Sequence, residues 1–399
     1  MRRFFGSSRC VLCSSDCAPE LHHVDGNKDN EDVFDWVPLC ANHNKEEYYA
    51  RVCLHRGLPF EMRPQSIDER AFRLTMEGQL PRAYGCNLVG AFLNLYVDAD
   101  WTVVFSANAI NNLRPLFEID RITDVVARLI VPTVKSPDSF SRIMPSHLAL
   151  LCKEMGSVYL DFGNTDAFCD WYRLGNAYIQ REPARNKSDT AVINFRLTLH
   201  ELIAKSYRLH ADLMQGKTLA DASDILEQFV ALDRQMMESR YHAGRANVAI
   251  HNARVLRTLG DCDAAEAALS SVWTILGAAE PSGREAVPEI IERKLGTWWM
   301  VAGLLAEAAS IALEQGDAER AGEFANWAYE VYKEKRIRIS GFVEIPGLTW
   351  FQKEHVSSER AFRVKDTSAW EVSLAEFGFI ETAQVVYKCL LDEEHRTRN

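Results

Sequence analysis

The sequence lacks an uninterrupted apolar run of the length that a membrane-spanning helix requires. The best candidate, MVAGLLAEAASIAL, is interrupted by a glutamate. The opening segment MRRFFGSSRC carries positive charge, but the apolar stretch of a secretory signal does not follow it. These absences exclude the usual signatures of membrane insertion and secretion. We therefore expect a soluble, cytoplasmic protein with no membrane partner.

The chain also has no Walker-type P-loop, no GxGxxG and no GxSxG motif, so it carries none of these nucleotide-binding or serine-hydrolase signatures. Positive charge is in deficit, because 45 Lys and Arg residues stand against 56 Asp and Glu residues and the net charge is −11. Nucleic-acid-binding proteins are more often basic, so tight nonspecific DNA binding is disfavoured. A protein that meets an anion through bound cations is not excluded.

Cysteine and histidine are plentiful, and both are concentrated near the N-terminus. Five of the ten cysteines lie in the first 53 residues, at Cys10, Cys13, Cys17, Cys40 and Cys53. Four of the eleven histidines share this region, at His22, His23, His43 and His55. In a cytoplasmic chain of 399 residues, such cysteines more often mark metal sites or buried thiols than disulfides.

Two ligand pairs within this region predict a structural zinc site. Cys10-x-x-Cys13 and Cys40-x-x-His43 each have the two-residue gap that lets both side chains reach one tetrahedral ion. A helix over residues 39–49 would place Cys40 and His43 on one face, since they are three residues apart. Cys17 or Cys53 could replace one of these ligands. A small domain with little core gains much of its folding free energy from such an ion.

Between the two pairs, the sequence resembles the HNH endonuclease family over residues 9–50. The resemblance rests on the histidine pair His22-His23, the turn Asp25-Gly26-Asn27 and the step Leu39-Cys40, in that order. It implies a ββα-metal fold, in which two strands and a helix surround the metal. Adjacent residues of an extended segment point to opposite sides, so His22 and His23 are expected to have different tasks.

The resemblance also implies residue roles. His22 and Asn44 are expected to hold a catalytic Mg²⁺ or Mn²⁺, and His23 is expected to act as the general base. Three positions depart from the commonest family pattern. His43 stands where the fourth zinc cysteine is usual, Asn44 stands at the final histidine, and Asp35 stands at the middle asparagine, which usually orients the site.

Beyond about residue 86 the sequence has helical periodicity, and three breaks recur at Gly163-Asn164, Gly260-Asp261 and Gly316-Asp317. Such breaks are typical of helix ends followed by a new helix cap. Residues 140–335 resemble tetratricopeptide repeats, which stack into a solenoid. An irregular all-α domain is the alternative. The positions expected to be small are Gly156, Phe168 and Gly175, then Ala253, Ala265 and Val272, then Ala309, Ala321 and Ala328. Phe168 and Val272 depart from the pattern.

The predicted fold class is mostly α, with a zinc-stapled ββα module followed by a helical-repeat solenoid. Pro59, Pro64 and Pro81 place a domain boundary between the module and the helices. The segment RIRISGFVEIPGLTWF favours a strand or an extended insertion. The expected order is a module over residues 1–60, a linker over 61–85, repeats over 86–335, and an extension with closing helices over 336–399.

Two functions from different classes fit these features. The first is a metal-dependent endonuclease that cuts DNA, with RNA as a second possible substrate. Its helical body would bind a protein or peptide, self-assemble, or sense a signal, a layout that resembles bacterial antiphage effectors. The second is a scaffold in which zinc only folds the module. The basic run at residues 333–339 and the pair Trp298-Trp299 are weaker candidate contacts.

Overall fold

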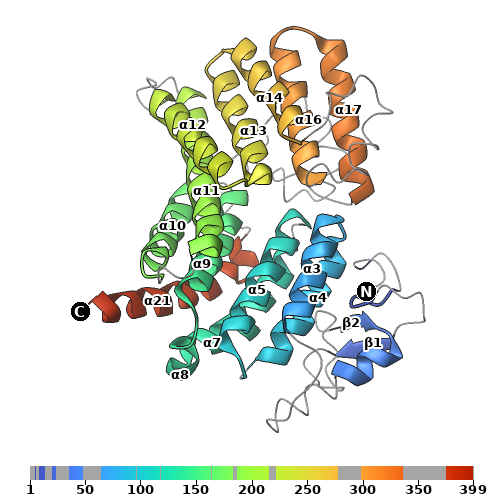
Figure 1. Ribbon diagram of the computed structural model, residues 1–399, viewed down its shortest axis with the longest axis vertical. Coiled ribbons are helices and arrows are strands. Elements are labelled where there is room, and N and C mark those ends of the chain that lie inside the picture. Colours follow the sequence, from blue (N-terminus) through green and yellow to red (C-terminus); the bar gives the residue numbers. More distant parts are fainter. Residues whose placement is uncertain are drawn as a thin grey trace. The chain divides into compact units, whose positions relative to one another are not determined.

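The computed structural model is mostly helical, with a two-stranded sheet near the N-terminus (Figure 1). It describes residues 5, 9–13, 20–23, 36–47, 64–95, 97–116, 118–162, 164–182, 187–214, 222–276, 298–335 and 374–398. Among the helices of these residues, none combines the length and apolar composition needed to cross a bilayer.

The chain divides into two compact units, which are considered separately. The first comprises Met1–Met155, Ala177–Glu182 and Glu371–Asn399. The second comprises Gly156–Asn176 and Pro183–Trp370. The first unit therefore contains the segments expected to be a zinc module and a linker, together with several of the helices that follow them.

The segment expected to be a linker, residues 61–85, is helical over most of its described length. Helix α3 spans Pro64–Met76, and helix α4 spans Leu80–Asn94. Pro64 is the first residue of α3, and Pro81 lies in the first turn of α4. Proline is tolerated there because the first N–H groups of a helix have no intrahelical acceptor. The prolines thus mark helix starts, while Pro59 lies outside the described residues.

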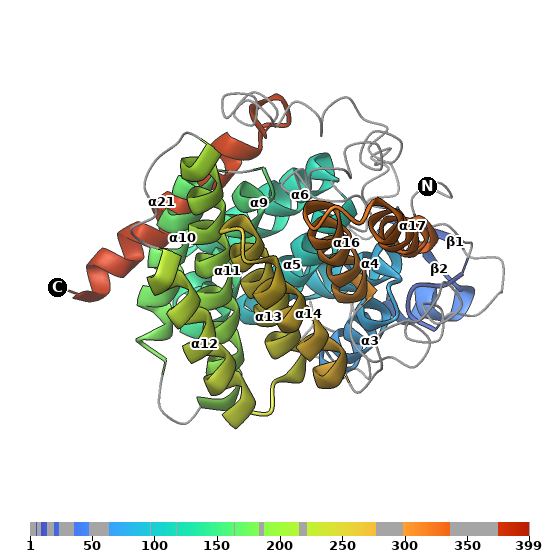
Figure 2. The ribbon, with the colours of Figure 1, turned by 90° about the horizontal axis from the view of Figure 1, so that it is seen from above.

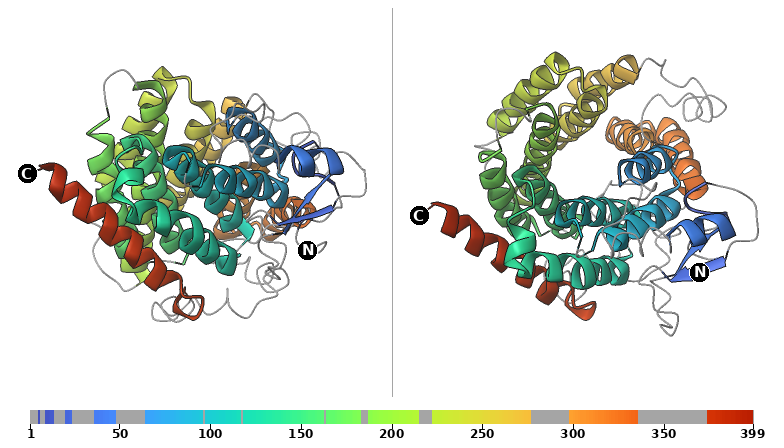
Figure 3. Two further views of the ribbon diagram at one scale, coloured as in Figure 1. Left: turned by 90° about the horizontal axis from the view of Figure 1, so that it is seen from below. Right: turned by 60° about the horizontal axis from the view of Figure 1, so that its bottom comes forward.

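The remaining helices of the first unit are short, apart from α5 and α21. Asp98 begins α5 by accepting hydrogen bonds from the backbone N–H groups of Asp100 and Trp101. At the other end of the chain, α21 packs against α6 and α7 (Figure 3). It supplies one of the closing helices expected after residue 335. The bounds are α5 Ala99–Leu113, α6 Ile119–Val125, α7 Val131–Lys135, α8 Pro137–Phe140 and α21 Phe379–Arg398, with a π-helical turn at Val126–Ile130.

The second unit is built from long helices, each of which packs against a neighbour in sequence (Figure 2). The bounds are α11 Lys187–Met214, α12 Ala222–Glu238, α13 His242–Thr258, α14 Cys262–Leu276, α16 Trp298–Glu314 and α17 Ala318–Lys335. Helices α9 (Pro145–Asp161) and α10 (Thr165–Ile179) each have residues in both units.

Two of the three predicted turns between helices fall where the sequence predicts them, while Gly163 of the first turn lies outside the described residues. Gly260 and Gly316 have φ angles of 84° and 83°, a left-handed conformation that glycine adopts without a Cβ clash. The next residue caps the following helix in both cases. Asp261 Oδ1 accepts from the N–H of Ala264 at 3.1 Å, and Asp317 Oδ1 accepts from the N–H of Arg320 at 3.0 Å. These helix–turn–helix pairs are confirmed.

Small residues let paired helices approach closely, as expected. A Cβ atom on Gly156 would lie 2.9 Å from the Cβ of Trp171. The alanines at the expected small positions are all buried: Ala253, Ala265, Ala309, Ala321 and Ala328. The two exceptions, Phe168 and Val272, are fully buried as well. Whether these pairs form a regular solenoid stays a prediction.

Candidate metal centre and histidine pair

Strands β1 (Glu20–His23) and β2 (Trp36–Leu39) form an antiparallel pair, and residues 41–47 are helical directly after β2. This is the strand–strand–helix order that the resemblance implies. In the register, His22 lies opposite Val37 and His23 lies opposite Trp36. The N–H of Asn44 donates to the carbonyl of Cys40 at 2.9 Å, which forms the first helical turn.

Four side chains form a cluster that could hold a metal ion, namely Cys10, Cys13, Cys40 and His43. Their ligand atoms all lie within 4.8 Å of one another. Zinc bound tetrahedrally to sulfur and nitrogen separates two sulfurs by about 3.8 Å, and a sulfur from a nitrogen by about 3.6 Å. Cys13 Sγ lies 3.9 Å from Cys40 Sγ, and Cys10 Sγ lies 3.5 Å from His43 Nδ1. The donor set therefore fits zinc.

The electrostatics of the cluster favour a cation. Burial alone would lower the pKa of His43, but the hydrogen bond to Cys40 and the charges of Cys13, Cys40 and Glu46 raise it above its ordinary value. Cys40 Sγ lies 3.1 Å from His43 Nδ1. Groups that stabilise a proton on this nitrogen also stabilise a metal ion in its place.

Helix α4 holds the turn that carries the first two cysteines. Arg82 donates to the carbonyl of Cys10 at 2.8 Å, and the thiol of Cys86 donates to the carbonyl of Val11 at 3.0 Å. A Cβ atom on Gly85 would lie 2.9 Å from Val11 Cγ1, so the turn packs directly on the helix backbone. Burial raises the pKa of the Cys86 thiol to about 12, which keeps it a donor at neutral pH.

The structure brings His22 and Asn44 together. His22 Nδ1 lies 2.7 Å from Asn44 Oδ1, although the two residues are far apart in sequence. His22 is buried, with 8% of its surface exposed. The neighbouring residues, His23 and His43, point to different partners, as the strand and helix periods predict. One side of the module thus holds the cysteine cluster, and another holds this histidine–amide pair.

Glu47 belongs to the second group, and sequence reasoning missed it. Its Oε2 atom lies 2.8 Å from His22 Nε2, and the residue is 1% exposed. The sequence spacing could have indicated that Glu47 lies near Asn44, since the two residues are three apart and share a helix face. That signal is weak alone, because most glutamates on a short helix face solvent.

His23 has a partner that limits its chemistry. The indole Nε1–H of Trp36 donates to His23 Nδ1 at 3.1 Å, and the two rings meet edge to face at 5.4 Å. A neutral imidazole has one acceptor nitrogen and one donor nitrogen. With Nδ1 accepting, Nε2 carries the proton, and neither nitrogen has a lone pair ready to accept a proton from water.

Several predicted residues lie outside the described part of the chain. These are Asp35, the turn Asp25-Gly26-Asn27, the alternative zinc ligands Cys17 and Cys53, and residues 336–351, which hold the end of the basic run and the segment expected to be a strand or extended insertion. Trp298 and Trp299 begin α16, but their side chains are not described. The predictions made for all of these residues remain untested.

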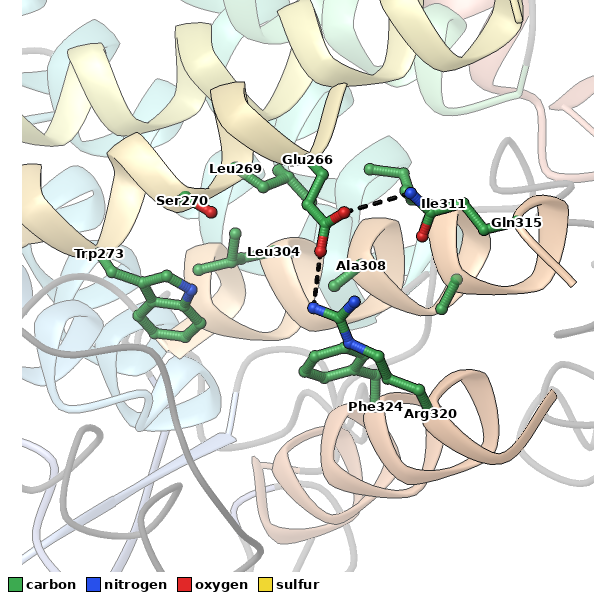
Figure 4. Close-up of a pocket in the computed structure, with 11 residues that line it drawn as sticks. Glu266, Leu269, Ser270, Trp273, Leu304, Ala308, Ile311, Gln315, Arg320 and Phe324 are labelled. Carbon is green, nitrogen blue, oxygen red and sulfur yellow. Dashed lines mark hydrogen bonds and ion pairs between the residues drawn. The ribbon is translucent and has the colours of Figure 1, made fainter. Parts of the chain in front are cut away.

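A small pocket in the second unit lies among α14, α16 and α17 (Figure 4). Among the residues that line it, Glu266 forms an ion pair with Arg320 at 2.7 Å and accepts a hydrogen bond from Gln315 at 3.1 Å. The cavity volume of about 20 Å³ is on the scale of one water molecule, so the space inside suits a solvent molecule rather than a ligand.

Comparisons of the whole chain with protein-family models, with curated protein sequences and with solved structures give no match.

Proposed function

We propose that the chain is a metal-dependent, HNH-type endonuclease that hydrolyses phosphodiester bonds in DNA. The observation that carries this proposal is the 2.7 Å approach of His22 to Asn44, beside a separate cysteine–histidine cluster on the same strand–strand–helix frame. A purely structural zinc module needs the cluster but not the second pair. DNA is favoured over RNA as the substrate.

In this proposal the two groups have different tasks. Cys10, Cys13, Cys40 and His43 bind Zn²⁺ and fix the helix after β2 against the hairpin. His22 and Asn44 are the ligands that the resemblance implies for Mg²⁺ or Mn²⁺. That ion, when bound, supplies positive charge beside the leaving oxygen. Asp35 would orient the site from the family's middle-asparagine position.

His23 accepts a proton from the attacking water in this scheme, so that a hydroxide oxygen bonds to phosphorus while the P–O bond of the leaving group breaks. The near-neutral pKa of an imidazole suits this task. The hydrogen bond from Trp36 to Nδ1 must break first, because a neutral ring that accepts there has no other lone pair to offer. We propose that substrate binding displaces the indole.

The helices of the second unit are proposed to form a solenoid that binds a protein or peptide partner, or a second copy of the chain. The two described left-handed glycine turns and the buried alanines of each helix pair support this. Such a body could license cutting in response to a signal, as the antiphage resemblance implies. The cytoplasm is the proposed location.

A plasmid-cleavage assay with Mg²⁺ or Mn²⁺ tests the proposal. Wild type should cut, and His23→Ala should not, with the zinc content of both proteins equal. Asn42→Ala is the matched control, since Asn42 is an exposed residue of the same helix and should cut as wild type does. Absence of cutting by wild type under every metal and partner condition would overturn the nuclease proposal.

The alternative function is a scaffold, with a zinc-folded module and a peptide-binding helical body. The Trp36–His23 hydrogen bond favours it, because this contact occupies the nitrogen that a general base needs. The net charge of −11 also favours it. In that case His23→Ala should leave every measured activity unchanged.

A further inference from the structure

We propose that Glu47 is a ligand of the catalytic divalent cation, bound together with His22 Nε2, and that Asn44 positions the His22 ring instead of binding the ion. This inference rests on the proposed function, because it assumes a second metal ion near His22. It changes the ligand set that the resemblance implies, replacing a neutral amide by a carboxylate.

The first argument is the state of His22 Nε2. This atom is buried and has no properly directed hydrogen bond to any described residue, although Glu47 Oε2 lies only 2.8 Å away. The distance is that of a hydrogen bond, but the ring N–H direction does not point along it. Two ligands bound side by side on an octahedral ion are separated by about 2.8–3.0 Å, given metal–ligand distances of about 2.0–2.1 Å. The observed separation fits that arrangement.

The second argument is the tautomer of the ring. Asn44 Oδ1 can only accept, so the 2.7 Å contact places a proton on His22 Nδ1. With the ring neutral, Nε2 carries a lone pair and lies 2.8 Å from a carboxylate oxygen, beside the direction of that lone pair rather than along it. Two acceptors this close repel each other unless a cation lies between them. An imidazolium–carboxylate pair is the competing explanation, and it requires an N–H directed from Nε2 toward Glu47.

The third argument is the chemistry of burial. Glu47 is 1% exposed, and burying an ionised carboxylate is less costly when positive charge lies beside it. A divalent cation supplies such charge. Both Mg²⁺ and Mn²⁺ bind the charged oxygens of a carboxylate in preference to the neutral oxygen of an amide. Asn44 and Glu47 also lie on one face of the helical residues 41–47, so both reach the same ring from one side.

The test measures Mn²⁺ binding to the zinc-loaded, full-length chain by the loss of the free Mn²⁺ signal in electron paramagnetic resonance. Wild type should bind one Mn²⁺ in addition to zinc. Glu47→Gln keeps the side-chain shape and should weaken this binding at least about tenfold. Asn44→Ala removes the group that positions the His22 ring but no ligand, and should stay within about threefold of wild type. Glu69→Gln, at an exposed position on α3, is the control and should bind as wild type does.

A second measurement identifies the nitrogen that meets the ion. In long-range ¹H–¹⁵N spectra of histidine-labelled protein, Mg²⁺ should shift the Nε2 resonance of His22 and leave the proton on Nδ1. Zinc content and circular dichroism establish that each variant is folded.

Each remaining outcome overturns the inference in a distinct way. If Glu47→Gln binds Mn²⁺ as wild type does while Asn44→Ala has lost binding, Glu47 is not a ligand and the proposed nuclease site stands. If wild type binds no ion besides zinc, the inference and the proposed function are both overturned. A Mg²⁺-induced shift at Nδ1 instead of Nε2 would assign the ion to the Asn44 side of the ring.

Discussion

Trp36 and His23 face each other across the β1–β2 pair, and the indole N–H donates to Nδ1 of the imidazole at 3.1 Å. The bond fixes the ring as the tautomer protonated at Nε2. A histidine held in this way is a donor. The residue that the family resemblance marks as the base is therefore restrained by its cross-strand neighbour in this structure.

Trp36→Phe should increase the cleavage rate if His23 is the base. Phenylalanine keeps the edge-to-face ring contact but cannot donate to Nδ1. Removing one neutral hydrogen bond of ~1 kcal/mol corresponds to a rate increase of about fivefold. Single-turnover plasmid cleavage measures the change, with Trp101→Phe in α5 as the matched control. A rate at or below that of wild type would argue that the Trp36 contact does not restrain catalysis.

Zinc binding should weaken as the pH falls, and the loss should begin at a higher pH than an ordinary histidine would cause. The pKa of His43 is raised above 6.5 by Cys40, Cys13 and Glu46 despite burial. A proton on Nδ1 competes directly with the metal, so competition grows as the pH falls through that raised pKa. Competition with a colorimetric chelator across a pH series measures the effect. A zinc affinity that stays constant until well below pH 6.5 would contradict it.

Helix α4 packs directly on the turn that carries Cys10 and Cys13, so we expect this turn to be sensitive to a substitution at Gly85. An added Cβ would meet Val11 Cγ1 at 2.9 Å and Phe5 Cε1 at 3.1 Å, and both side chains are buried. Gly85→Ala should therefore destabilise the first unit by about 1–3 kcal/mol and speed zinc release to a chelator. Gly303→Ala in α16 is the control, since nothing lies within 4 Å of its added Cβ. Equal zinc release by the two variants would show that the turn shifts at no cost.

Much of this arrangement could be predicted from local periodicity. Strand alternation separates His22 from His23, and helix spacing separates His43 from Asn44, so the division of these side chains into two groups follows from the sequence. The Trp36–His23 pair could not be predicted, because it depends on strand register, which the sequence between the strands does not reveal. Glu47 was missed because its burial depends on tertiary packing. Pro64 and Pro81 lie at helix starts, and the domain boundary expected from them stays a prediction, since helix starts and linkers both favour proline.

In the second unit, Glu307 should contribute to stability in a pH-dependent way. It is fully buried between Arg254 and Arg257, at 3.1 Å and 2.6 Å. Burial alone would raise its pKa, but the two guanidinium groups hold the pKa below its ordinary value of 4.5. A group whose pKa is lower in the folded chain stabilises the fold above its unfolded pKa, and this contribution is lost as the pH falls through the folded pKa.

Glu307→Gln should therefore lower the free energy of unfolding by about 3 kcal/mol near neutral pH, because it removes the buried carboxylate that pairs with both guanidinium groups, while Arg257 keeps its ion pair with Glu314 at 2.6 Å. The difference between variant and wild type should shrink as the pH falls below 4.5, where wild type also loses the charge. Urea denaturation of both proteins, monitored by circular dichroism near neutral pH and again below pH 4.5, measures the difference in the free energy of unfolding. Glu323→Gln, at an exposed position on α17, should show no such difference. If the Glu307→Gln deficit were the same at both pH values, the carboxylate charge would not be what stabilises the α13–α16 contact, and the loss would have to come from packing.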